Sequence, residues 1–123
     1  MEKMNVFKCA ICGNMVEVLS VGGGTLACCG QAMNVMEENS VDAAVEKHIP
    51  VVDKAGSTVS VFVGDVVHPM MENHYIEWIE VITATKILRK WLEPGNEPKA
   101  DFDVDEEILK VREHCNLHGL WKA

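Results

Sequence analysis

Four of the five cysteines of this chain lie in two close pairs near its N-terminus. Cys9 and Cys12 form a C-x2-C pair followed by Gly13, whereas Cys28 and Cys29 are adjacent. Two such pairs can complete a tetrahedral site of four thiolates, which holds zinc or iron. The adjacent cysteines can bind one ion only if a sulfur–metal–sulfur angle opens beyond the ideal. That distortion tunes an iron centre but brings no benefit to a structural zinc, so the pattern favours iron.

The fifth cysteine and four of the five histidines form a second candidate site. Each lies in a context typical of a loop: near a proline, just before a predicted strand, or in the turn C-N-L-H-G. Four imidazoles and one thiolate are one ligand more than a tetrahedral structural zinc accepts. They suit a five-coordinate iron in a square pyramid, with one position open for chemistry. The predicted ligands are His48, His68, His74, Cys115 and His118.

Two structural units are expected to position these side chains. Residues 1–37 hold four of the cysteines and are too few to fold alone, so we predict a small domain stabilised by metal. Residues 38–123 form the second predicted domain. Its valine-rich stretch 50–63 is interrupted by a turn at A-G-S, and further strands are predicted over 75–84, 85–92 and 106–115. Short strands with regular turns predict an all-β chain that contains a small antiparallel sandwich.

Other segments receive different assignments. Residues 41–48 are predicted to form a short helix, because Pro50 ends it and capping residues precede it. Residues 93–107 carry seven acidic residues against one lysine, which predicts a solvated loop. Trp78, Trp91 and Trp121 are assigned to the sandwich core, and Trp121 also to packing under the second metal site.

Charge and composition exclude several classes of partner. The net charge of −8 and the pI near 5.0 argue against binding to nucleic acid or to an anionic membrane surface. No stretch approaches the ~20 apolar residues of a membrane span, and the N-terminus lacks a signal-peptide pattern. We therefore expect a cytoplasmic protein, a setting in which close cysteines are metal ligands or redox groups rather than disulfides.

Five motifs resemble those of desulfoferrodoxin, the two-iron class of superoxide reductase, and together they span essentially the whole chain: FKCAICGN, LACCGQAM, ENSVDAAVEKHIPVV, HPMMENHYIEWIEV and CNLHGLWKA. The resemblance implies a rubredoxin-like or desulforedoxin-like N-terminal domain followed by an immunoglobulin-like β-sandwich, usually as a homodimer. It implies one iron held by the four N-terminal cysteines. It also implies a second, catalytic iron with four equatorial histidines and axial Cys115, which reduces superoxide to hydrogen peroxide.

The resemblance also implies functions for residues outside the ligand set. Lys47 would attract the superoxide anion, and Glu46 would occupy the sixth position of the oxidised iron. A donor such as rubredoxin would restore the ferrous state, and the first iron would either relay electrons or act structurally. His114 departs from the family, which often has tyrosine before the ligand cysteine. We assign it to the surface or to packing, with an adjustment of the thiolate's electronics or of the pH dependence as the alternative.

The residues alone leave three other functions open. A pure electron carrier would have no open metal position, and a zinc-ribbon binding module would be colourless. A redox sensor derived from the same family is a third possibility, against which the retained Glu46, Lys47 and all five predicted ligands argue. Neither the carrier nor the zinc module explains why four histidines and a cysteine occupy loop-like positions.

Overall fold

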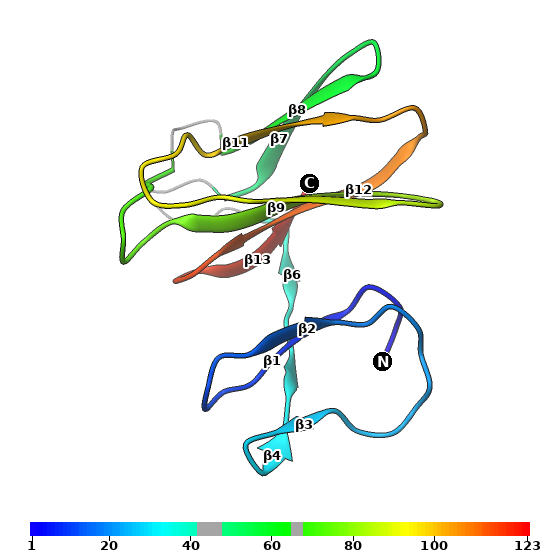
Figure 1. Cartoon of the computed structure of the whole chain (residues 1–123), viewed down its shortest axis with the longest axis vertical. Coiled ribbons are helices and arrows are strands. Elements are labelled where there is room, and N and C mark those ends of the chain that lie inside the picture. The colour runs from blue at the N-terminus through cyan, green and yellow to red at the C-terminus, as the bar shows by residue number, and fades with distance from the viewer. Residues whose placement is uncertain (42–47, 65–67) are drawn as a thin grey trace. The chain divides into compact units, whose positions relative to one another are not determined.

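The computed structural model describes residues 1–41, 48–64 and 68–123, and this part of the chain is all-β (Figure 1). It divides into two compact units, Met1–Glu37 and Glu38–Ala123. The described residues contain no helix long and apolar enough to cross a membrane. The all-β prediction is confirmed. The helix predicted over 41–48 falls on residues 42–47, which lie outside the described residues.

The first unit consists of very short strands. Its sheet has the order β2-β1-β5, formed by β1 (Val6–Lys8), β2 (Met15–Glu17) and β5 (Asn34–Val35). A separate hairpin pairs β3 (Ala27–Cys28) with β4 (Gln31–Ala32). The buried apolar side chains of the first unit are those of Val6, Cys9 and Val18. So small a core is typical of domains that depend on a bound metal for stability.

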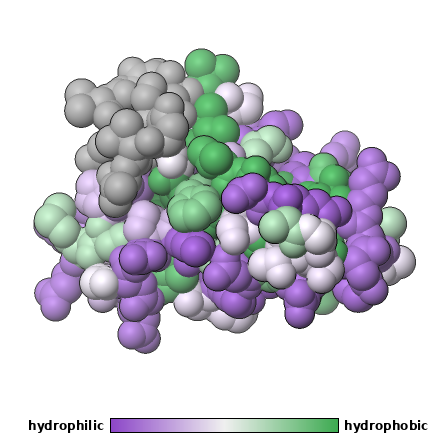
Figure 2. Space-filling model, turned by 90° about the horizontal axis from the view of Figure 1, so that it is seen from above, coloured by the Kyte–Doolittle hydropathy of each residue, from purple (hydrophilic) through white to green (hydrophobic). Residues whose placement is uncertain are grey.

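The second unit contains two sheets (Figure 1). The larger has the order β10-β9-β12-β13-β6 and is formed by β6 (Glu38–Asn39), β9 (Ile76–Thr83), β10 (Ile87–Trp91), β12 (Ile108–Cys115) and β13 (Gly119–Lys122). The smaller has the order β11-β8-β7 and is formed by β7 (Pro50–Ala55), β8 (Thr58–Val63) and β11 (Lys99–Asp103). In the view from above, apolar residues gather near the middle and hydrophilic residues lie mostly at the margins (Figure 2).

The hydrophobic core lies between these two sheets. Val59, Val61 and Val63 point inward from β8 and are almost completely buried, as their alternation predicts. They pack with apolar residues of the opposite sheet, among them Ile79 and Val81 of β9. Two facing β-sheets with a shared core are the architecture of an immunoglobulin-like sandwich, so the predicted fold class is confirmed.

The prediction of a solvated loop over residues 93–107 is wrong for its central part. Residues 99–103 form strand β11, which pairs with β8 at the edge of the smaller sheet. Ala100 and Phe102 alternate with charged residues and are buried, whereas Asp101 and Asp103 are exposed. The prediction rested on the number of acidic residues and overlooked that they alternate with apolar residues, as in a strand. Charges on an edge strand also discourage pairing with other chains.

A β-bulge in β9 determines what faces the core near the end of β12. His114 pairs with Trp78, but Cys115 pairs with Ile76, so Glu77 is the extra residue. Without the bulge, Cys115 and Ile76 could not both point inward, because side chains alternate between the faces of a strand. Both are fully buried in the core.

The outer face of the larger sheet carries a buried ion pair. The Oε1 atom of Glu80 accepts hydrogen bonds from Nε and Nη2 of Arg112, at 2.8 and 2.5 Å. Arg89 binds the other carboxylate oxygen of Glu80. Both Glu80 and Arg112 are almost completely buried, so each charge depends on the other for compensation.

The tryptophans are not core residues of the sandwich. Trp91 is 70% exposed, so its assignment to the core is wrong. Trp78 is buried, but it lies on the outer face of the larger sheet with Glu80, two residues further along β9. Trp121 is half-buried and stacks on His48 at 4.7 Å between ring centroids, as the prediction that it packs under the metal site expects.

Replacement of Arg112 by leucine will destabilise the protein by about 3 kcal/mol or more, because the carboxylate of Glu80 stays buried without its main partner. Urea unfolding followed by circular dichroism measures this loss. Arg89→Leu is the matched control: it removes a guanidinium that binds the same carboxylate but is partly exposed, and it will cost less. Equal losses in the two variants would contradict the assignment.

Candidate metal centres

The four N-terminal cysteines converge, as predicted. Their sulfur atoms all lie within 4.8 Å of one another, and all four thiols are free of disulfides. The sulfurs of Cys12 and Cys28 are 3.6 Å apart, and those of Cys28 and Cys29 are 4.0 Å apart. The C-x2-C turn closes through a hydrogen bond of 3.0 Å from the Gly13 N–H to the Cys9 carbonyl oxygen.

The adjacent cysteines can share a site because they belong to a hairpin turn. Cys28 pairs with Gln31 across β3 and β4, so Cys29 and Gly30 form the two-residue connection. Both have positive φ, +53° and +77°, which is the requirement of a type I′ turn. Positive φ costs a non-glycine residue roughly 1 kcal/mol or more. This backbone conformation directs the Cys29 sulfur toward the same site as the Cys28 sulfur.

The pKa values of Cys9 and Cys29 are shifted in opposite directions. Backbone N–H groups of Cys12 and Ile11 donate to the Cys9 sulfur and lower the pKa of that thiol to about 6. The neighbouring sulfurs of Cys12 and Cys28 raise the pKa of Cys29 to about 12. Four thiolates can therefore coexist at neutral pH only when a cation compensates their charges, which is the behaviour expected of a metal site.

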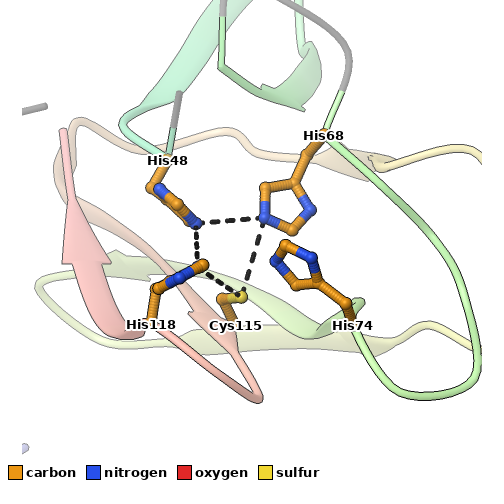
Figure 3. A group of neighbouring side chains, drawn as sticks. All are labelled: His48, His68, His74, Cys115 and His118. Atoms are coloured by element: carbon orange, nitrogen blue, oxygen red, sulfur yellow. Dashed lines mark hydrogen bonds between the residues drawn. The ribbon is translucent and has the colours of Figure 1, made fainter. Parts of the chain in front are cut away.

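The five predicted ligands of the second site also converge. Their ligand atoms lie within 4.8 Å of one another, and all except those of the exposed His118 belong to buried side chains. Figure 3 shows the four imidazoles at the corners of a closed ring. Successive ring centroids, in the order His48, His68, His74, His118, are 4.7, 4.9, 5.1 and 4.8 Å apart. Neighbouring rings are inclined at 66° to 81°.

The sulfur of Cys115 approaches opposite corners of this ring. It lies 3.6 Å from Nε2 of His68 and 3.8 Å from Nδ1 of His118. Nε2 of His48 lies 3.1 Å from each of the same two nitrogens. Four nitrogens in a square with one sulfur beside them match the square-pyramidal donor set predicted from residue types.

Local structure orients the histidines. Nδ1 of His68 donates to the carbonyl oxygen of Pro69 at 2.7 Å, which leaves Nε2 unprotonated and directed at the site. Two backbone hydrogen bonds between His74 and Met71 close the turn that carries His74. Gly119, with φ +87°, ends the tight turn that brings His118 back beside Cys115.

Asn116 is a residue that the sequence analysis missed. Its side-chain oxygen accepts from the Tyr75 N–H at 2.9 Å, and its Nδ2 donates to the Asn73 carbonyl oxygen at 3.1 Å. It thereby ties the loop that carries His74 to the turn that carries Cys115. An asparagine in a turn between two metal ligands was the only hint in the sequence.

Three further residues were singled out by the sequence analysis: Glu46, Lys47 and His114. Glu46 and Lys47 lie outside the described residues, so their roles stay predictions. His114 is buried and stacks on Trp78 at 5.9 Å, and its Nδ1 lies 2.8 Å from a carboxylate oxygen of Glu77. Its burial excludes the surface position that the sequence analysis allowed, and it does not belong to the group of candidate ligands.

The donor atoms fit the metals expected of them. Four sulfurs at tetrahedral spacing suit iron or zinc, and an imidazole-rich set of five donors exceeds the four that structural zinc uses. Together the two clusters define the class of the protein: a two-centre, mononuclear non-haem metalloprotein whose second centre is built on a β-sandwich.

Comparison with known proteins narrows this class to one family. Residues 40–123 match the family model described as desulfoferrodoxin, and residues 1–36 match the model of the desulfoferrodoxin N-terminal domain. A desulfoferrodoxin of Syntrophotalea carbinolica is 54% identical over 122 residues, which are 99% of this chain and 97% of that protein. The chain therefore belongs to the desulfoferrodoxin family, and its two clusters match the family's two iron sites.

Solved structures show the same relationship. The superoxide reductase of Treponema pallidum has a TM-score of 0.83 and 32% identity, and the alignment covers 98% of each chain. The one-iron superoxide reductase of Giardia intestinalis has a TM-score of 0.56 and 32% identity. That alignment covers 63% of this chain and 95% of the other.

Replacement of Asn116 by alanine will weaken metal binding at the second site by roughly 10- to 100-fold, as loss of a residue that orients ligands does. The measurement is the release of iron to a chelator, followed separately for the two centres by their visible absorption. Asn73→Ala is the control, because only the backbone of Asn73 takes part in the contact. Unchanged iron retention in Asn116→Ala would show that the contact does not support the site.

Proposed function

We propose that this protein is a superoxide reductase, an oxidoreductase that transfers one electron to superoxide and releases hydrogen peroxide without forming oxygen. The observation that carries this proposal is the square of four imidazoles with the Cys115 thiol beside it. Iron bound there would supply the electron. Membership of the desulfoferrodoxin family and the similarity to two solved superoxide reductases support the same activity.

The protein's own residues contribute charge and access to this reaction. Four neutral imidazoles and one thiolate leave a divalent cation with a net positive charge, which attracts an anionic substrate. His118 is exposed, so one edge of the cluster reaches solvent and a small anion can enter there. Cys115 is buried, so its thiolate would supply electron density to an iron held there from the protein interior.

Lys47 and Glu46 precede His48 in the sequence and are proposed as catalytic residues. The ammonium group of Lys47 would attract superoxide against the net charge of −8 and assist proton delivery to the product. The carboxylate of Glu46 would take the open metal position after turnover. Glu46→Ala should therefore change the spectrum of the oxidised protein more than its rate of reduction of superoxide.

Several properties of the family are proposed here for the whole molecule. Residues 1–37 and 38–123 act as two domains, which the two compact units support. A homodimer is supported by an apolar row across the N-terminal sheet, where Phe7 pairs with the exposed Val16 and Val35.

An electron donor such as rubredoxin restores the reduced state. Five cysteines without a disulfide support a cytoplasmic location.

The reduced protein, mixed with a limited amount of superoxide, will yield one hydrogen peroxide for each superoxide consumed. Pulse radiolysis with peroxide and oxygen detection measures this ratio. A dismutase would give half as much peroxide together with oxygen, and a zinc-filled protein would be colourless and unreactive. Cys115→Ser will abolish the reaction and the band of the second iron, whereas Cys12→Ser will remove only the colour of the four-sulfur centre.

Lys47→Ala will slow the bimolecular reaction with superoxide by about tenfold, because local positive charge raises association rates of anions by roughly 10 to 10³. The dependence of the rate on ionic strength will also become weaker. Lys54→Ala, which removes an exposed lysine of β7, is the charge-matched control and will have little effect. An unchanged rate in Lys47→Ala would exclude its role in attracting the substrate.

A further inference from the structure

Among the five candidate ligands of the second metal site, only His118 is exposed. It also presents a different nitrogen to the site. Nδ1 of His118 lies 3.1 Å from Nε2 of His48 and 3.8 Å from the sulfur of Cys115, whereas His48 and His68 face each other through Nε2. Nδ1 is bonded to the ring carbon that joins the side chain, so its position follows the backbone of His118 closely. Anything that fixes this backbone therefore fixes the donor atom.

Trp121 contacts both His118 and its neighbour in the square. Its indole Nε1 donates a hydrogen bond of 3.0 Å to the carbonyl oxygen of His118. Its ring stacks on the imidazole of His48, with 4.7 Å between ring centroids and 16° between planes. His48 and His118 are adjacent corners of the square, with ring centroids 4.8 Å apart (Figure 3). One side chain therefore holds two adjacent ligands, one through its backbone and the other through its ring.

The backbone of Trp121 is held on both sides. Strand β13 lies between β12 and β6 in the larger sheet, and Trp121 pairs with Glu113 of β12 and with Asn39 of β6. Residues directly opposite each other in antiparallel strands project from the same face of the sheet. Glu113 precedes Cys115 by two residues, so Trp121 projects from the face on which Cys115 lies. The indole is thus carried by a paired strand and not by a loop, which limits its movement.

We propose that Trp121 is a positioning residue of the second metal site, which holds His48 and His118 in place at the exposed edge where a small anion enters. The inference deepens the proposed superoxide reductase function and rests on it for the role of this edge. Trp121 is not among the candidate ligands, so its effect passes through the two imidazoles. Loss of a residue that orients metal ligands typically weakens metal binding by roughly 10- to 100-fold.

The two contacts of Trp121 restrain different movements. The hydrogen bond restrains the peptide that follows His118, in the turn that ends at Gly119. The stack restrains the tilt of the His48 ring, since aromatic pairs prefer particular arrangements. Because His118 is exposed, burial does not hold its ring, and without the indole it can turn away from the square. The environment of the metal is therefore expected to change even while the metal stays bound.

The test compares Trp121→Leu and Trp121→Phe with the unaltered holoprotein, each as the full chain with iron in both centres. One measurement is the rate at which a chelator removes the second iron. The other is the visible and electron paramagnetic resonance spectrum of that iron after oxidation. Trp121→Leu removes both contacts and will speed release of the second iron by roughly tenfold or more. It will also shift the spectra of the second iron, whereas the four-sulfur centre will keep its colour and its release rate.

Trp121→Phe separates the stack from the hydrogen bond. Phenylalanine keeps an aromatic ring beside His48 but has no N–H to donate to the His118 carbonyl oxygen. Its rate of iron release will lie between those of the unaltered protein and Trp121→Leu, and its spectra will move back toward the unaltered ones. A role in folding alone would change the urea midpoint of the variants but not the spectra of the iron that stays bound.

Trp91→Leu is the matched control. Trp91 is also a tryptophan of the second unit, but it is 70% exposed and belongs to β10, at the opposite end of the larger sheet from β6. Its replacement will leave the release of the second iron and the spectra unchanged.

Three outcomes would overturn the proposal. The first is unaltered iron release and unaltered spectra in Trp121→Leu. The second is a change of the same size in Trp91→Leu. The third is Trp121→Phe that behaves as Trp121→Leu does, which would show that the stack on His48 contributes nothing. If Trp121→Leu does not fold, Trp121→Phe decides, and identity with the unaltered protein in both measurements would overturn the proposal.

None of these measurements uses superoxide, so the positioning role and the proposed function fail separately. A holoprotein that leaves superoxide unreacted would refute the proposed function without changing the release rates or the spectra.

Discussion

The buried sulfur of Cys115 is the group on which the arrangement of the catalytic unit depends. It lies at the end of a central strand and faces the sandwich core, because the bulge at Glu77 lets both Cys115 and Ile76 point inward. A thiolate in such a place is costly unless a cation compensates it. Metal binding and folding of this end of the sandwich are therefore coupled, and the loops with the four histidines close around the same point.

Charge distinguishes the two centres. Four thiolates around a divalent ion give a net negative site, whereas four neutral imidazoles and one thiolate give a net positive one. Only the second attracts a small anion, and its edge at His118 is exposed to solvent. The first site distributes its charge through backbone N–H donors to Cys9 and Cys12, which suits electron storage or a structural role better than catalysis on superoxide.

The two faces of the larger sheet carry different kinds of side chain. Its inner face carries the apolar core and Cys115, and its outer face carries the Glu80–Arg112 ion pair and the rings of Trp78 and His114. Because neighbouring residues of a strand point to opposite faces, His114 and Cys115 connect these environments through a single peptide bond. A residue assigned to the surface or to packing is thus the nearest link between the outer face and the metal ligand.

The types and local spacing of residues were enough to predict the chelating pairs Cys9-x2-Cys12 and Cys115-x2-His118. The other three histidines were predicted as ligands only from their loop-like contexts. Alternation alone also placed the valines of β8 in the core. Only the tertiary structure decided the rest. Strand β11 was hidden by its acidic residues, and the exposure of Trp91 depends on its position at a sheet edge. The square of imidazoles, and the clamp by Asn116, join segments far apart in the sequence, which no local pattern can specify.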